Sequence, residues 1–188
     1  VAMLHAVKGR EPGKPLQVVF PHRESLLATV SFGKRLTDAC LRLLPGPVTL
    51  VVPYPDDLTC PPPGQVVHEE RRTLGKRRCV AVATLGVRVP HWPAPAQLLA
   101  TLPFPLVVSS ANLSGAPAPS TLADVDPAVL VACDLVLDGG PALGVASTVV
   151  DLSRYEDTGL WRILREGVWS ARDVEERLPG QADAYKAP

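Results

Sequence analysis

Short hydrophobic runs alternate along this chain with polar and proline-rich stretches, which predicts a domain that mixes helices and strands. Apolar residues recur at helical spacing in Val1–Val7 and in Arg23–Leu44, which forms one helix or two hinged near Gly33. Further short helices are predicted at Pro95–Leu102, at Pro127–Ala132 and from the N-cap Ser170 to Leu178. Apolar and β-branched runs predict strands at Leu16–Phe20, Val48–Val52, Cys79–Val89 (one strand, or two around Gly86), Leu106–Ser109, Asp134–Leu137, Thr148–Leu152 and Leu160–Leu164.

The stretch 53–78 shows no helical or strand periodicity. Its prolines Pro61–Pro63 and a basic cluster indicate a surface excursion, either a solvated loop or a contact for RNA or a partner. That cluster comprises Arg71, Arg72, Lys76, Arg77 and Arg78. Helices and strands intermingle elsewhere without a regular βαβ rhythm or a glycine-rich nucleotide fingerprint. The predicted fold class is therefore α/β (α+β) with a mixed sheet.

Composition narrows the function classes further. The 188 residues suffice for one domain, predicted at 1–178 and followed by a tail at 179–188. Nineteen basic residues balance nineteen acidic ones, so no global field favours nucleic acid or a membrane. No apolar run approaches the ~18 residues of a membrane span, and the four cysteines lack zinc or disulfide spacing. We expect a cytoplasmic protein with no metal site.

Two cations stand at the end of the first predicted helix, in Lys8-Gly9-Arg10. Lys and Arg at a helix C-terminus complement the helix dipole, which is one explanation of their position. The alternative is an anion clamp, in which the ammonium and the guanidinium converge on phosphate oxygens.

The segment Ser109 to Gly115 (SSANLSG) follows a predicted strand and is rich in small polar residues. Such a segment exposes backbone N–H groups and lets a ligand approach closely, and Ser110 and Asn112 can both donate and accept hydrogen bonds. A polar turn that caps a following helix would have the same composition.

Single arginines interrupt two predicted strands. Alternation would put Arg88 on one face with Thr84 and Gly86, where it is either exposed to solvent or part of a site. Arg165 ends a later strand and has the same two interpretations. The histidines are not near an obvious serine or cysteine nucleophile, and we expect them to be ordinary surface or core side chains: His5, His22, His68 and His91.

Six segments in order resemble the YrdC/Sua5 family of threonylcarbamoyl-adenylate synthases. They are KGRxxxKPL (8–16), PGPVTLVV (45–52), TLGVRVP (84–90), SSANLSG (109–115), STVVDLS (147–153) and ILREG (163–167). Each block is weak alone, but six in the right order are highly specific. The resemblance implies a YrdC-like twisted mixed sheet, flanked by helices, around a central cavity lined by basic residues.

The resemblance also implies a reaction. Members combine L-threonine, bicarbonate or CO2 and ATP into threonylcarbamoyl-AMP and release pyrophosphate. The product supplies the t6A37 modification of tRNA, so contact with tRNA or with the transferase complex is a further expectation. Magnesium is expected with ATP as the substrate complex, without a tightly bound cofactor.

By the same likeness, particular positions acquire roles. Those expected to bind ATP are Lys8, Arg10, Thr84, Ser110, Ala111, Asn112 and Arg165. Those expected to bind threonine are Arg88, Ser109 and Ser147. No residue is assigned as a general acid or base.

The chain departs from the family pattern in places. Members carry a PTDTVYGL-like segment before the first helix, so the domain is expected to be incomplete at its N-terminus. Position 118 is Ala where members often have Ser, which puts one nucleotide contact in doubt. The alternatives are therefore a non-catalytic RNA-binding paralogue, a related carbamoyl-transfer domain or a truncated, inactive fragment.

Overall fold

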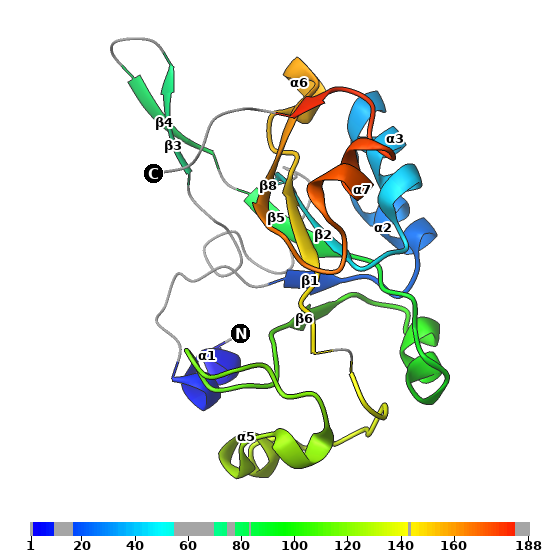
Figure 1. Ribbon diagram of the computed structural model, residues 1–188, viewed down its shortest axis with the longest axis vertical. Helices are drawn as coiled ribbons and strands as arrows, with labels where there is room; N and C mark the ends of the chain where they lie inside the picture. The colour runs from blue at the N-terminus through cyan, green and yellow to red at the C-terminus, as the bar shows by residue number, and fades with distance from the viewer. Residues whose placement is uncertain are drawn as a thin grey trace.

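A mixed sheet of seven strands is the framework of the computed structural model, which describes residues 2–9, 17–54, 70–74, 78–82, 84–142 and 144–182 (Figure 1). In sheet order the strands are β6 (Leu106–Val108), β1 (Gln17–Val19), β5 (Thr84–Arg88), β2 (Val48–Pro53), β7 (Thr148–Asp151), β8 (Leu160–Arg165) and β9 (Gln181–Ala182). The interior strand β5 runs parallel to β1 and antiparallel to β2, and β2 runs parallel to β7. This arrangement confirms the predicted mixed-sheet α/β class.

Helices α2 (Arg23–Thr29), α3 (Lys34–Leu43) and α7 (Ala171–Glu175) lie together on one side of this sheet (Figure 1). The predicted hinge near Gly33 is confirmed, since Gly33 is the N-cap of α3. The buried core between these helices and the sheet includes Leu26, Leu36, Ala39, Cys40, Leu43, Leu50, Val52, Leu85, Val87, Val150 and Val174. Apolar side chains on one face of each element thus drive the packing of this layer.

The first helix, α1 (Ala2–Lys8), lies apart from that layer and contacts α5 (Pro127–Val131) (Figure 1). The helix predicted at Pro95–Leu102 is present as a 3-10 helix, η2 (Ala94–Thr101). The capping box of Ser170 with Asp173 is also confirmed, although α7 ends at Glu175 rather than at Leu178. Two short elements escaped the sequence analysis: η3 (Leu122–Asp124) and α6 (Tyr155–Thr158).

Three expectations about strands are wrong. Asp134–Leu137 forms no strand, because no strand among the described residues pairs with it, and its side chains are exposed. The irregular stretch 53–78 contains β3 (Glu70–Leu74), which pairs with β4 (Arg78–Val82) in a separate antiparallel hairpin. Gly86 does not divide a strand, since it lies inside β5 and pairs with Gln17 and Val51 on the two neighbouring strands.

The predicted tail begins with a paired segment, because Gln181 and Ala182 form β9 and pair with Leu160 and Trp161 of β8. The domain boundary at 178 remains a prediction. Among the described residues, no helix is long and apolar enough to cross a membrane.

Alternation along β5 separates the two faces of the sheet. Leu85 and Val87 are fully buried against the helices, so Thr84, Gly86 and Arg88 point to the opposite face. The register places Leu50 of β2 opposite Val87, so the next pair, Thr49 and Arg88, shares that opposite face.

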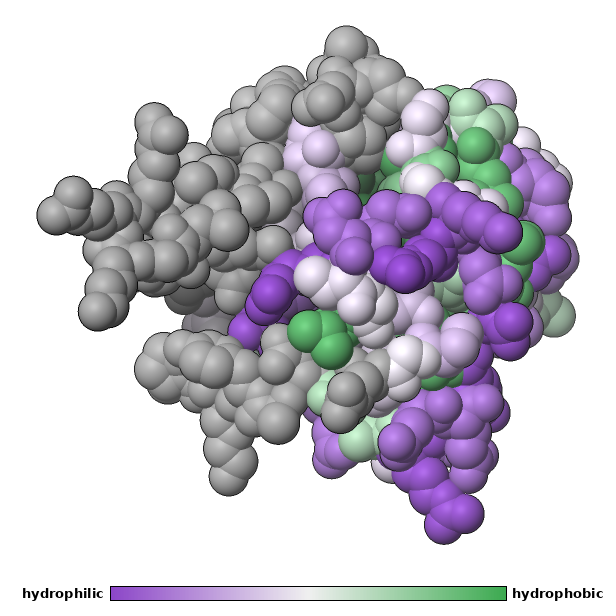
Figure 2. All heavy atoms as spheres, turned by 90° about the horizontal axis from the view of Figure 1, so that it is seen from above, coloured by the Kyte–Doolittle hydropathy of each residue, from purple (hydrophilic) through white to green (hydrophobic). Residues whose placement is uncertain are grey.

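The end of the molecule that carries α6 is mostly hydrophilic at its described surface (Figure 2). From α6, the Glu156 carboxylate caps the amino end of α3: Oε2 accepts from Leu36 N at 2.9 Å and Oε1 from Arg35 N at 3.3 Å. Gly33 leaves the room for this contact, because a Cβ there would collide with the Glu156 carboxylate. A glycine before α3 therefore lets a carboxylate neutralise the helix N-terminus.

We expect Gly33→Ala to destabilise the fold by about 1–2 kcal/mol, because the new methyl group displaces the carboxylate that caps α3. The measurement is the free energy of unfolding from urea denaturation. Gly139→Ala is the matched control, since a Cβ at Gly139 meets nothing within 4 Å. Equal effects of the two substitutions would contradict this account of Gly33.

Candidate functional site

The Lys8 ammonium is the centre of a polar cluster between α1 and the loop that follows β6. Lys8 is only 5% exposed, and its Nζ donates to Ser109 Oγ at 2.8 Å, Ser110 O at 2.6 Å and Ser110 Oγ at 3.0 Å. Asn112 Oδ1 lies 3.4 Å from the same nitrogen. We call these four residues the lysine cluster. A buried ammonium needs such acceptors, because leaving it unpaired would be costly.

The backbone holds the same contact together, since Ser114 N donates to the Lys8 carbonyl oxygen at 3.0 Å. This carbonyl belongs to the last residue of α1. The last carbonyl groups of a helix have no donor within the helix, so they need partners from elsewhere. The turn in the segment SSANLSG therefore does not cap a following helix but closes over the end of α1.

A second group of polar side chains gathers where β5, β2, β7 and β8 lie side by side. Arg88 ends β5, Thr49 lies beside it on β2, Ser147 immediately precedes β7, and Arg165 ends β8 opposite Val149. We call Thr49, Arg88, Ser147 and Arg165 the arginine cluster. All four lie on the sheet face opposite the helices or at its margin.

Hydrogen bonds connect three members of the arginine cluster. Arg165 Nη2 donates to the Ser147 carbonyl oxygen at 2.8 Å and lies 3.4 Å from Ser147 Oγ. Thr49 Oγ1 and Ser147 Oγ are 3.0 Å apart, and both residues are buried. The sequence analysis missed Thr49. A threonine within the apolar run PGPVTLVV was the signal available for it.

The fourth member, Arg88, has an unmet hydrogen-bond donor. Its Nε is buried without a hydrogen-bond partner among the described residues. Burial lowers the pKa of the Arg88 guanidinium, and the positive charge of Arg165 lowers it further. A ligand carboxylate or phosphate at this point would supply both the missing acceptor and the missing negative charge.

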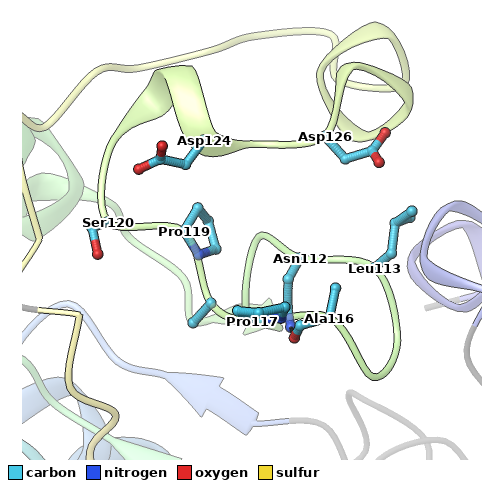
Figure 3. Close-up of a pocket in the computed structure, with 9 residues that line it drawn as sticks. Asn112, Leu113, Ala116, Pro117, Pro119, Ser120, Asp124 and Asp126 are labelled. Atoms are coloured by element: carbon cyan, nitrogen blue, oxygen red, sulfur yellow. Dashed lines mark hydrogen bonds between the residues drawn. The ribbon is translucent and has the colours of Figure 1, made fainter.

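A pocket of about 400 Å3 borders the lysine cluster (Figure 3). Asn112, Ala116 and Pro117 line one side, and Asp124 and Asp126 of the η3–α5 segment face them across it. Both carboxylates already accept hydrogen bonds, Asp124 from Thr121 and Asp126 from Ala128 N. The hydrogen bonds from Thr121 lower the pKa of the Asp124 carboxyl. This pocket has acidic residues in its wall, so the central basic cavity remains a prediction.

The remaining predicted residues are placed as follows. Thr84 begins β5, is buried, and shares a face with Arg88. Ala111 is exposed in the loop of the lysine cluster. Arg10 lies outside the described residues. In the part of the chain that the structure describes, no group of three or more His, Cys, Asp or Glu side chains could hold a metal ion, and Cys40 and Cys133 are free thiols.

Relatives of known name cover nearly all of this chain. A threonylcarbamoyl-AMP synthase from Bacillus subtilis is 30% identical over 183 residues, and one from Pyrococcus abyssi is 27% identical over 178 residues. These matches cover 93% and 94% of this chain but only 46% of each relative. The chain thus spans less than half the length of these two relatives.

Solved structures share the fold. A variant of Pyrococcus abyssi Sua5 matches 96% of this chain with a TM-score of 0.71 and 26% identity, covering 49% of that chain. The same protein in complex with L-threonine gives a TM-score of 0.72 at 24% identity, over 97% of this chain and 48% of its own. Escherichia coli YciO gives 0.64 at 24% identity, over 92% of this chain and 75% of its own.

A family model described as "Telomere recombination", which covers Sua5, YciO and YrdC, matches residues 1–167. It includes all four members of each cluster. The chain therefore belongs to the Sua5/YciO/YrdC family.

Proposed function

We propose that this chain is an L-threonylcarbamoyladenylate synthase, which makes threonylcarbamoyl-AMP and pyrophosphate from L-threonine, bicarbonate or CO2 and ATP for the t6A37 modification of tRNA. The observation that carries the proposal is the buried Arg88 Nε without a partner, beside Arg165 and Ser147. A donor at this position can bind the carboxylate of an amino acid, while the ammonium of the lysine cluster can bind phosphate. The names of the two sequence relatives and the threonine complex of Sua5 support the same reaction.

In this proposal the lysine cluster binds the nucleotide. Lys8 Nζ already has oxygen acceptors at 2.6–3.0 Å, so phosphate oxygens can replace part of an existing shell rather than require a new one. Asn112 belongs both to the cluster and to the pocket wall. Phosphates at Lys8 would therefore direct the nucleoside toward the pocket, past Ala111. Arg10, Thr84 and Arg165 complete the proposed ATP site, and Mg2+ enters with ATP as part of the substrate.

Arg88 and Ser147 of the arginine cluster bind threonine in the same proposal, while Arg165 faces the nucleotide. The Arg88 guanidinium offers a planar fork of donors that matches a carboxylate. In this proposal Ser147 of the same cluster and Ser109 of the lysine cluster complete the amino-acid site. The amino acid would thus lie between the two clusters, with its amino group free to react.

The chemistry follows from this placement. The threonine amine adds to CO2 and loses a proton to water, which gives a carbamate. A carbamate oxygen then attacks the α-phosphorus of ATP as the bond to the pyrophosphate oxygen breaks. Negative charge accumulates on the phosphoryl oxygens, where Lys8, Arg10 and Arg165 stabilise it. Neither cluster contributes a carboxylate or an imidazole. Positioning of the reactants and fixed positive charge therefore account for the proposed rate enhancement.

We expect pyrophosphate release from ATP in bicarbonate buffer to depend on L-threonine and to fall at least about 100-fold in Lys8→Ala. Lys34→Ala removes the same charge from an exposed position on α3 and serves as the matched control. Release that continues without threonine, or that survives Lys8→Ala, would contradict the synthase function. Salt-dependent tRNA binding by a folded sample without turnover would favour the RNA-binding alternative instead.

Arg88→Lys is expected to raise the KM for threonine about tenfold and to change the KM for ATP less than about twofold, because an ammonium cannot reproduce the guanidinium fork. Steady-state kinetics with each substrate varied in turn measures both values. Arg42→Lys is the control, since Arg42 forms an exposed ion pair with Asp38 on α3. An equal rise in both KM values would contradict the assignment of Arg88 to the threonine site.

A further inference from the structure

The hydroxyl groups of Thr49 and Ser147 form a buried pair inside the arginine cluster. Their oxygens are 3.0 Å apart, although the residues are 98 positions apart in sequence. Thr49 is 1% exposed and Ser147 is 7% exposed. Thr49 also lies beside Arg88, because the β2–β5 register pairs Leu50 with Val87 and the next residue on each strand continues it. Thr49 therefore has two neighbours in the cluster: Ser147, to which it is hydrogen-bonded, and Arg88, the residue proposed to bind the carboxylate.

The neighbouring groups indicate which of the two hydroxyl groups donates this hydrogen bond. The Arg165 guanidinium can only donate, so at 3.4 Å Ser147 Oγ is the acceptor. In either direction one hydroxyl proton lacks an acceptor among the described residues: the Thr49 proton if Ser147 donates, or the Ser147 proton if Thr49 donates. A donor without an acceptor costs more the more deeply it is buried, and Thr49 is 1% exposed whereas Ser147 is 7% exposed. Thr49 is therefore the better donor: both lone pairs of Ser147 Oγ are then occupied, and the Ser147 proton is left for an outside acceptor.

We propose that Thr49 is a positioning residue, which donates to Ser147 and thereby turns the Ser147 hydroxyl into a donor toward the carboxylate of the bound amino acid. The proposal rests on the synthase function, in which Ser147 belongs to the threonine site. It deepens that function by assigning Thr49 a role in the selection of a substrate that carries a carboxylate.

Within the described part of the chain, the arginine cluster contains two hydrogen-bond donors without acceptors, which agrees with the binding of a carboxylate. Arg88 Nε has no partner among the described residues, and the Ser147 proton has none when Thr49 donates. Both side chains belong to one cluster on the same part of the sheet. A carboxylate has two oxygens and accepts from both donors at once, whereas a neutral amine has a single lone pair and would leave one donor unsatisfied.

Thr49→Val tests the hydrogen bond with little change in shape, and Thr49→Ser is the matched control that keeps the hydroxyl. We expect Thr49→Val to weaken L-threonine binding about tenfold in calorimetry. The KM for ATP and the melting temperature should stay close to the wild-type values. Thr49→Ser should bind within about twofold of the wild type. Adding Thr49→Val to Ser147→Ala should cause no further loss, because Thr49 acts through Ser147.

The result that overturns the proposal is equally specific. Wild-type binding in Thr49→Val, a Thr49→Ser protein as weak as Thr49→Val, or independent losses in the double variant would each contradict it. So would a parallel rise in the KM for ATP, which indicates a structural role. The wild-type arm tests the proposed function separately: a folded wild-type protein that binds no threonine overturns the synthase function, and the role of Thr49 with it.

Discussion

The alternation of side chains along the interior strand β5 is the constraint on which the rest of this structure depends. Leu85 and Val87 are fully buried with the helices, and the pleat then directs Thr84 and Arg88 to the other face. The neighbouring strands are paired in register with β5, so their side chains are divided between the same two faces of the sheet. A shift of one residue would bury Arg88 in the core and expose Val87. Hydrophobic burial on one face thus fixes the position of the cationic chemistry on the other.

The two clusters meet the cost of buried charge in different ways. In the lysine cluster, the Lys8 ammonium is supplied with serine and asparagine oxygens from the chain itself. In the arginine cluster, two guanidinium groups are close enough for the charge of Arg165 to lower the pKa of Arg88, and one Arg88 nitrogen has no acceptor among the described residues. The first cluster is therefore supplied with acceptors by the chain itself, whereas the second leaves one donor that an anion would satisfy.

Much of the fold could be predicted because local rules decide it. The β-branched run of β2, the capping box of Ser170 and the hinge at Gly33 depend on neighbours within a few residues. The errors arose where pairing decides. Asp134–Leu137 has the composition of a strand, but a strand needs a hydrogen-bonded neighbour, and none among the described residues provides one. The polar strand β3 was missed for the opposite reason, since its own sequence lacks a strand pattern and its pairing with β4 defines it.

The sequence by itself determined the class of fold, the family, and the residues that carry charge: Lys8, Arg88 and Arg165 stand in ordered motifs that local reading can recognise. Only the tertiary structure decided which of them act together. It joined Lys8 to Ser109 and Ser110 across 101 and 102 residues, and it brought Thr49, which the sequence analysis missed, to Ser147 across 98. The physical reason is that strand order and register set these distances. Both follow from burial of the whole sheet rather than from any local pattern.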